Sequence, residues 1–305
     1  MRTAGGPRVA DLVNYRVADR DLKYYVFDWD DNILRMPTRI HLEHRTPEGA
    51  WEPRAVSTTV FTLVRNDTAN YRPPGGDWDR AFVEFRDCDE DGGESRFLKD
   101  TEAAVEAVMS GREPPPPSFE RFRLALIEGR LFAIVTARGH RRETIRRGVE
   151  YFIQRVLTAG ERSAMVRNLR GYLDCFENRA HEMTDAEVVD YYLGFNRYHP
   201  VTSPEFKSSV AGPASAWSPE RAKQLAVRDF VHHIVSILRQ AGMSRPVSIG
   251  FSDDDRRNVI AVEDYIRREL AREFPGVSFV VYDTSDPSMP SGRKVTVSGQ
   301  LKLSL

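Results

Sequence analysis

The amino-acid sequence predicts an α/β fold with a mostly parallel sheet, and two observations lead to this prediction. First, four short runs of apolar, β-branched and aromatic residues have the length of buried strands. Second, helical patterns separate these runs along the chain, and such alternation is typical of βα units whose strands lie parallel. The four predicted strands are Tyr24–Phe27, Leu131–Val135, Val247–Phe251 and Val277–Tyr282.

The predicted helices carry recognisable start and stop signals. One helix is expected to begin at Ser118, a candidate N-cap, and to end near Gly129, a candidate C′ glycine. After the second strand, apolar residues recur at helical spacing from Ile145 to Leu157. Ser218, followed by proline, predicts the start of a third helix, and a fourth is expected over about 258–273.

Two regions interrupt the alternation, and we predict that both are insertions. Residues 36–117 contain the strand-like pieces Thr58–Val64 and Ala81–Phe85, which predict a β-rich flap or small cap. Met36-Pro37-Thr38 at its start either forms a hinge or merely ends a turn. Residues 159–217 are rich in aromatic residues and then in Ser, Pro, Gly and Ala, which predicts a helical insertion followed by a loop. The core is then expected to combine residues 20–35, 118–158 and 218–290.

Length and composition are those of an ordinary globular protein. With 305 residues, the chain can form one large domain or a core with a substantial insertion. Its 44 Lys and Arg against 45 Asp and Glu provide no overall basic field, so nucleic acid is not favoured as a partner, although it is not excluded. No stretch approaches the ~20 apolar residues that span a bilayer, and the N-terminus lacks a secretion signal. We therefore expect a cytoplasmic protein without a membrane partner; its oligomeric state is not indicated.

Three carboxylates follow the first predicted strand directly, at Asp28, Asp30 and Asp31. Like charges this close raise one another's pKa unless a cation or hydrogen-bond donors compensate them. A hard divalent ion with oxygen ligands would supply that compensation. An isolated cluster of this kind is more often a solvated acidic turn.

The third predicted strand ends in the same way, in Asp253, Asp254 and Asp255. Because ligands of open α/β sheets bind at the carboxyl ends of the strands, the two acidic clusters could share one metal ion. The second predicted strand ends at Thr136, whose hydroxyl and backbone N–H at a helix start suit a phosphate oxygen. Three strand ends thus predict one site.

These residues resemble four ordered motifs of the haloacid dehalogenase superfamily of phosphohydrolases. The first motif is matched by Asp28-Trp29-Asp30-Asp31-Asn32-Ile33, with asparagine where the family usually has Thr or Val. The second is matched by Thr136, the third by Lys223 near a helix start, and the fourth by the pair Asp253-Asp254. Lys207 is the rival for the third motif. The resemblance covers about half the chain and implies a Rossmann-like core with cap insertions.

The resemblance also implies a mechanism, in which phosphate esters are hydrolysed through an aspartyl-phosphate. Asp28 would attack phosphorus, and Asp30 would protonate the leaving oxygen and then deprotonate water. Mg²⁺ would be held by Asp28, the Asp30 carbonyl and Asp253. Asp254 would ligate through water or orient its neighbours, unless it only faces a helix dipole. Halide release needs no such acid, so Asp30 favours phosphate esters.

Phosphate recognition is the remaining implied role. Thr136 and Lys223 would neutralise the non-bridging oxygens, although Lys223 could instead be an ordinary exposed lysine. Arg138 is close enough to Thr136 to contact the substrate, or it belongs with Arg141, Arg142, Arg146 and Arg147 to a solvated basic helix face. The leading hypothesis is a Mg²⁺-dependent phosphatase for a small or medium phosphorylated molecule. The alternatives are a catalytically inactive binding or regulatory module and a phosphatase for nucleic-acid ends.

Overall fold

The computed structural model describes residues 22–87, 95–176, 182–210, 218–243, 245–286, 288–289 and 292–298. Residues 1–21, on which the expectation about a secretion signal depends, lie outside the described residues. So do residues 211–217, most of the loop expected at the end of the second insertion. Among the described residues, no helix combines the length and the apolar character that crossing a bilayer requires.

A six-stranded sheet forms the core, in the order β6-β5-β1-β7-β8-β9. Neighbouring strands pair in parallel except for β9, which is antiparallel to β8. The α/β prediction and its four strands are confirmed, each strand differing by one or two residues at its ends. The strands are β1 (Leu22–Phe27), β5 (Phe132–Thr136), β6 (Arg197–Pro200), β7 (Val247–Asp253), β8 (Val277–Asp283) and β9 (Arg293–Ser298).

Sequence analysis missed the two edge strands of this sheet. β6 has only four residues and ends in proline, and β9 alternates charged or polar residues with valine. Neither has a continuous apolar run: β6 is buried at three of its four positions but contains a histidine, and β9 leaves alternate residues exposed at the edge of the sheet. β6 lies within residues 159–217, so part of the predicted second insertion extends the core sheet.

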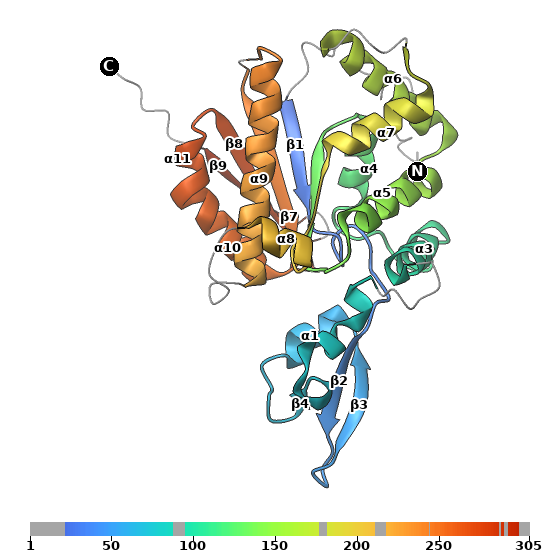
Figure 1. Cartoon of the computed structure of the whole chain (residues 1–305), viewed down its shortest axis with the longest axis vertical. Coiled ribbons are helices and arrows are strands. Elements are labelled where there is room, and N and C mark those ends of the chain that lie inside the picture. The colour runs from blue at the N-terminus through green and yellow to red at the C-terminus, as the bar shows by residue number, and fades with distance from the viewer. Residues whose placement is uncertain are drawn as a thin grey trace, which may run out of the picture.

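Helices cover both faces of the sheet (Figure 1). Successive side chains of β1 point to opposite faces: Tyr25 and Phe27 pack with one hydrophobic cluster, and Val26 packs with the other. The first face carries α4 (Phe119–Ile127), α5 (Arg142–Val156), α6 (Ala159–Phe176) and α7 (Asp185–Phe195). The second face carries α8 (Pro204–Ser209), α9 (Pro219–Gln240) and α10 (Arg256–Tyr265), which continues through a π-helical turn (Ile266–Leu270) into α11 (Ala271–Glu273).

Most predicted helix signals are confirmed. Ser218 caps α9, its hydroxyl accepting from the Arg221 N–H at 3.1 Å, and Gly129 adopts a φ of +62° just after α4. Ser118 precedes α4 as predicted, but its hydroxyl does not cap the helix. It contacts the Ser252 hydroxyl at 2.9 Å instead, because β7 ends beside it. This contact ties α4 to the end of the sheet where the acidic residues lie.

The first insertion forms a small lobe that projects beyond the core (Figure 1). Its antiparallel sheet has the order β3-β2-β4, from β2 (Ile40–Arg45), β3 (Trp51–Val56) and β4 (Tyr71–Arg72). The two predicted strands are wrong: Thr58–Val64 is helix α1, and Ala81–Phe85 covers the end of α2 (Trp78–Ala81) and a 3₁₀ turn. Ser57 caps α1 by accepting from the Val60 N–H at 3.2 Å, so capping overrides the β-branched composition.

Helix α3 (Arg96–Met109) connects this lobe back to the core, and its sequence pattern was not recognised. Its Phe97 is fully buried and packs against α5. At Gly148 of α5 a Cβ atom would lie 2.6 Å from the Phe97 ring, so glycine permits this close approach. Phe97 thereby fixes the lobe to the core next to Trp29, whose ring centroid is 5.6 Å away.

Candidate active site

The turn after β1 is held in place by Asn32, the residue that departs from the family pattern. Its side chain is fully buried, and Nδ2 donates to the Asp28 carbonyl at 3.1 Å and to Ser252 Oγ at 2.9 Å. Its Oδ1 accepts from Thr284 Oγ1 at 3.0 Å. Asn32 therefore joins the ends of β1, β7 and β8, for which its amide offers both donors and an acceptor.

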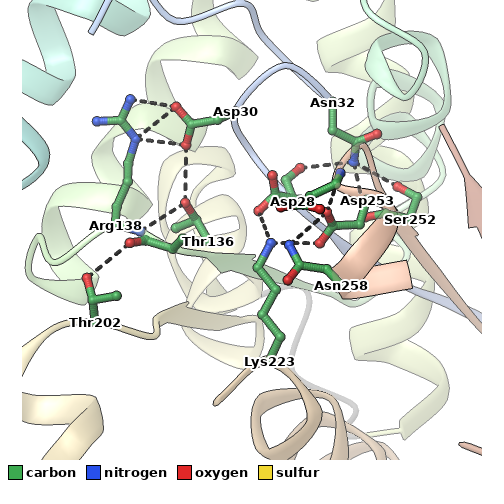
Figure 2. A network of polar contacts seen from close by, with 12 residues as sticks. Asp28, Asp30, Asn32, Thr136, Arg138, Thr202, Lys223, Ser252, Asp253 and Asn258 are labelled. Carbon is green, nitrogen blue, oxygen red and sulfur yellow. Dashed lines mark hydrogen bonds and ion pairs between the residues drawn. The ribbon is translucent and has the colours of Figure 1, made fainter. Parts of the chain in front are cut away.

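Beside this turn, Asp28, Lys223 and Asp253 lie together (Figure 2), and with the neighbouring Asp254 they form what we call the lysine cluster. Lys223 is 1% exposed, and its Nζ donates to Asp28 Oδ1 at 2.9 Å and to Asp253 Oδ2 at 2.6 Å. One oxygen of each of the three aspartates lies within 4.8 Å of the others. Lys223, rather than its rival Lys207, is thus the lysine that contacts these carboxylates.

Asp253 is held from two further directions. Its Oδ1 accepts from Asn258 Nδ2 at 3.1 Å and from the Asp255 N–H at 2.9 Å. Asn258 lies in the first turn of α10. Sequence analysis did not identify it as a site residue, although a polar side chain at the start of a helix that follows an acidic strand end was a possible indication. These donors fix the carboxylate that is most completely buried in the cluster.

Burial and like charge perturb the acids of the lysine cluster. Burial raises the pKa of Asp28 to about 8, and repulsion from Asp253 and Asp30 adds to it, while the Lys223 ammonium opposes the rise. Burial, followed by the charges of Asp28 and Asp253, also raises the pKa of Asp254 well above its ordinary value. Although burial disfavours its charge, the two carboxylates raise the pKa of Lys223, which stays an ammonium. One lysine does not compensate this much negative charge.

The oxygen donors of the lysine cluster fit a hard divalent cation. Mg²⁺ prefers carboxylate and carbonyl oxygens, and three carboxylates converge here from two neighbouring strands. The Asp30 carbonyl accepts only one hydrogen bond, from the Asn32 N–H at 2.6 Å, among the contacts of the described backbone, and a carbonyl has two lone pairs. A cation at this place would offset the repulsion that raises the carboxyl pKa values.

A second group, which we call the arginine cluster, consists of Asp30, Thr136, Arg138 and Thr38. The Arg138 guanidinium makes a two-pronged contact with Asp30, with Nε to Oδ2 at 2.9 Å and Nη2 to Oδ1 at 2.6 Å. Thr136 Oγ1 donates to Asp30 Oδ2 at 3.2 Å. Thr136 and Arg138, both expected to contact phosphate, are fully buried and engaged with Asp30 in this arrangement (Figure 2).

A cavity of about 340 Å³ opens above the two clusters, between the core and the first insertion. The core supplies its acidic floor, and the insertion supplies aromatic rings and arginines. Sequence analysis missed this second wall because nothing in the insertion resembled a motif. The wall consists of Ile40, Thr58, Phe61, Thr62, Arg65, Phe82, Phe85 and Arg86, and Lys207 of α8 also lines the cavity.

Two of the arginines after Thr136 form ion pairs. Arg142 lies 3.6 Å from the Glu205 carboxylate, and Arg146 pairs with Glu150 at 3.0 Å and with Asp190. Arg141, Arg142 and Arg147 are exposed, as expected for a solvated basic helix face, but Arg138 is fully buried and does not belong to that face. The cavity is therefore the place where a charged ligand would meet the acidic clusters.

No protein-family model matches the chain, and neither a curated protein nor a solved structure matches it. The functional conclusion therefore rests on the residues of this chain and their geometry.

Proposed function

We propose that this chain is a Mg²⁺-dependent phosphatase that hydrolyses a phosphate monoester through an aspartyl-phosphate on Asp28. The resemblance of its four motifs to the haloacid dehalogenase superfamily motivates the proposal. One structural observation carries it: Asp28 and Asp253 end two neighbouring parallel strands and share the buried Lys223 ammonium, at 2.9 and 2.6 Å. Nucleophile, metal ligand and phosphate-neutralising cation are thus adjacent.

In the first step, a carboxylate oxygen of Asp28 attacks phosphorus and the bond to the ester oxygen breaks. The leaving oxygen takes the electron pair of that bond and a proton from the Asp30 carboxyl group. Lys223 lies where it can compensate charge on the phosphoryl oxygens, because its ammonium already contacts Asp28. Asp30 is left as a carboxylate.

In the second step, the Asp30 carboxylate removes a proton from water, whose oxygen attacks phosphorus. The bond between phosphorus and Asp28 breaks, and the Asp28 carboxylate returns. When bound by Asp28, Asp253, Asp254 and the Asp30 carbonyl, Mg²⁺ supplies positive charge that offsets the phosphoryl oxygens and keeps Asp28 ionised. Burial raises the pKa of Asp28 to about 8, and the added positive charge would lower it.

The charges and size of the cavity agree with a small phosphorylated substrate. Seven acidic and six basic side chains line it, so a bound cation would increase its attraction for an anion. Its volume of about 340 Å³ lies at the lower end of small-molecule sites. The rings of Phe61, Phe82 and Phe85 offer an apolar wall to the organic part of the ester.

Phosphate release from a panel of phosphorylated metabolites, nucleotides and oligonucleotide ends tests the proposal. We expect hydrolysis of at least one small monoester with Mg²⁺ and its loss in a chelator. Hydrolysis that survives chelation would contradict the metal-dependent mechanism. Binding without turnover across the panel would favour the inactive binding module instead.

Substitution of the nucleophile provides a second arm. Asp28→Asn keeps the shape of the side chain but removes the attacking carboxylate, so we expect kcat to fall by at least ~10³-fold. Asp190→Asn is the matched control, since this aspartate is 75% exposed on α7 and outside the cavity. Equal activity of the Asp28→Asn variant and the wild type would exclude Asp28 as the nucleophile.

A further inference from the structure

A continuous series of polar contacts joins Asp30 to the first insertion. Besides its contact with Asp30, Arg138 Nη2 donates to Thr38 Oγ1 at 2.6 Å. Thr38 Oγ1 in turn donates to Asp100 Oδ2 at 2.5 Å. Thr38 precedes β2, and Asp100 lies on α3, so the segments that enter and leave the insertion's small sheet meet at this point.

These contacts are buried, and their directions are determined. Arg138 and Thr38 are 0% exposed and Asp100 is 4% exposed. Because a hydroxyl group has one proton, Thr38 can satisfy both neighbours only by donating to Asp100 and accepting from Arg138. Such a network holds its members in one arrangement, since water does not replace a broken contact.

Two aromatic rings of the insertion pack against the Arg138 guanidinium, which lies over each of them. Its central carbon lies 4.7 Å from the Phe85 ring centroid and 5.1 Å from that of Phe97. The first ring also lines the cavity, and the second anchors α3 to the core. The guanidinium that contacts Asp30 is therefore placed by the insertion as much as by the loop after β5 that carries it.

The insertion is further tied to Asp100 by ion pairs. Arg96 Nε donates to Asp100 Oδ1 at 3.1 Å, and Arg96 Nη2 lies 3.3 Å from Glu84 Oε2. Glu84 accepts from the Arg39 N–H at 2.9 Å, next to Thr38. A shift of the lobe would therefore disturb the contacts that end at Asp30.

We propose that Arg138, Thr38 and Asp100 are positioning residues that hold the Asp30 carboxyl group for proton transfer, so that placement of the insertion sets the acid–base geometry. This inference rests on the proposed phosphatase function. A two-pronged guanidinium contact fixes the plane of a carboxylate and stabilises its charged form. That form is the one left after Asp30 has given its proton to the leaving oxygen, and the one that accepts the proton of water.

The leaving group of the substrate distinguishes positioning of an acid from general structural support. An alkoxide is a poor leaving group and needs the proton from Asp30, whereas 4-nitrophenolate leaves without one. Thr38→Val hardly changes the volume of the side chain, but it removes the hydroxyl group that accepts from Arg138. The measured quantity is kcat/KM, because it reports the steps up to formation of the aspartyl-phosphate and leaves out the later attack of water, for which Asp30 is the base with either ester. We expect kcat/KM for an alkyl phosphate to fall by ~10–100-fold and kcat/KM for 4-nitrophenyl phosphate by less than about threefold.

Three further variants complete the experiment. Thr38→Ser keeps the hydroxyl and should restore the alkyl phosphate rate. Thr101→Val is the matched control, because this buried threonine of α3 donates only to the Phe97 carbonyl and should leave the ratio of the two rates unchanged. Arg138→Lys retains the charge without the planar fork, and it provides the same comparison if Thr38→Val does not fold.

The outcomes separate this inference from the proposed function. A wild-type chain that hydrolyses neither ester contradicts the phosphatase proposal and the inference with it. A wild-type chain that hydrolyses both, with Thr38→Val and Arg138→Lys lowering kcat/KM equally for both esters, contradicts only the positioning role. Selective loss of the alkyl phosphate rate, rescued by Thr38→Ser, supports it.

Discussion

The lysine cluster and the arginine cluster lie side by side but are supported by different parts of the molecule (Figure 2). Asp28 and Asp253 end core strands, and Lys223 comes from α9, which packs on the same sheet. Asp30 also follows a core strand, but its partner Arg138 is held by Thr38 and by rings of the insertion. The core alone thus builds one cluster, whereas the other needs the insertion.

Under the proposed function, this difference separates two tasks of one site. Phosphoryl transfer needs charges fixed on rigid elements, which parallel strand ends provide. Substrate selection and proton transfer depend on what closes over the site, and the insertion supplies both the cavity wall and the support of Asp30. Changes in the lysine cluster should therefore act on stability and metal binding, and changes around the arginine cluster should act through the insertion.

The largest expected effect is that of removing the ammonium group of Lys223 from the lysine cluster. Lys223→Met leaves Asp28 and Asp253 buried without their common partner, and breaking a buried pair in this way costs ~3–5 kcal/mol. Urea unfolding at neutral pH measures this loss. The control is Lys207→Met, because Lys207 is exposed on the cavity wall and its loss should cost less than ~0.5 kcal/mol. Similar costs for both variants would show that the lysine cluster does not stabilise the core.

A somewhat smaller effect is expected from metal binding. If Mg²⁺ binds the folded lysine cluster, it stabilises the native state by ~2.7 kcal/mol at a hundredfold excess over its dissociation constant. A thermal shift titration should show this in the wild type and not in Asp253→Asn, which loses a central carboxylate. Asp255→Asn is the control, since Asp255 caps α10 outside the three-carboxylate group. A shift that persists in Asp253→Asn would place the metal elsewhere.

The core was predictable from sequence because its central strands are buried on both faces. Phe132–Val135 is a continuous, fully buried apolar run for that reason, and any sheet that contains it must bury it. The insertion offers no such constraint. Thr58–Val64 has the composition of a strand, and only the Ser57 cap and the surrounding chain make it helical. None of its residues is buried, so packing fixes its conformation only weakly and the local cap decides the outcome.

The site was predictable where local sequence fixes position. Asp28 and Asp253 follow strands directly, so the parallel sheet brings them together once the strands are recognised. The partnership of Arg138 with Thr38 joins residues 100 positions apart, and neither the motif nor the helical spacing predicts it. Sequence analysis expected Arg138 to contact the substrate and did not predict that it contacts Asp30. Contacts of this kind depend on how the insertion docks.

The smallest expected effect concerns His140, which lies beside the arginine cluster. Its ring is fully buried against Phe97 at a centroid distance of 5.3 Å, and neither ring nitrogen has a hydrogen-bond partner among the described residues. Burial, aided by the Arg138 charge, lowers the pKa of His140 to about 2. The imidazole therefore stays neutral in the folded state over the whole range in which an unfolded histidine, with a pKa near 6.5, takes up a proton.

The sign of the pH dependence follows from this difference. Below about pH 6.5 the unfolded state binds a proton that the native state does not, so stability falls as the pH falls towards 2. Between pH 7.5 and 5.0 the loss from this one group is about 2 kcal/mol. Comparing urea unfolding of the wild type and His140→Leu at both pH values isolates it, because the variant keeps the other titrating groups. The wild type should lose about 2 kcal/mol more than the variant, and equal losses would mean that the insertion leaves His140 open to water.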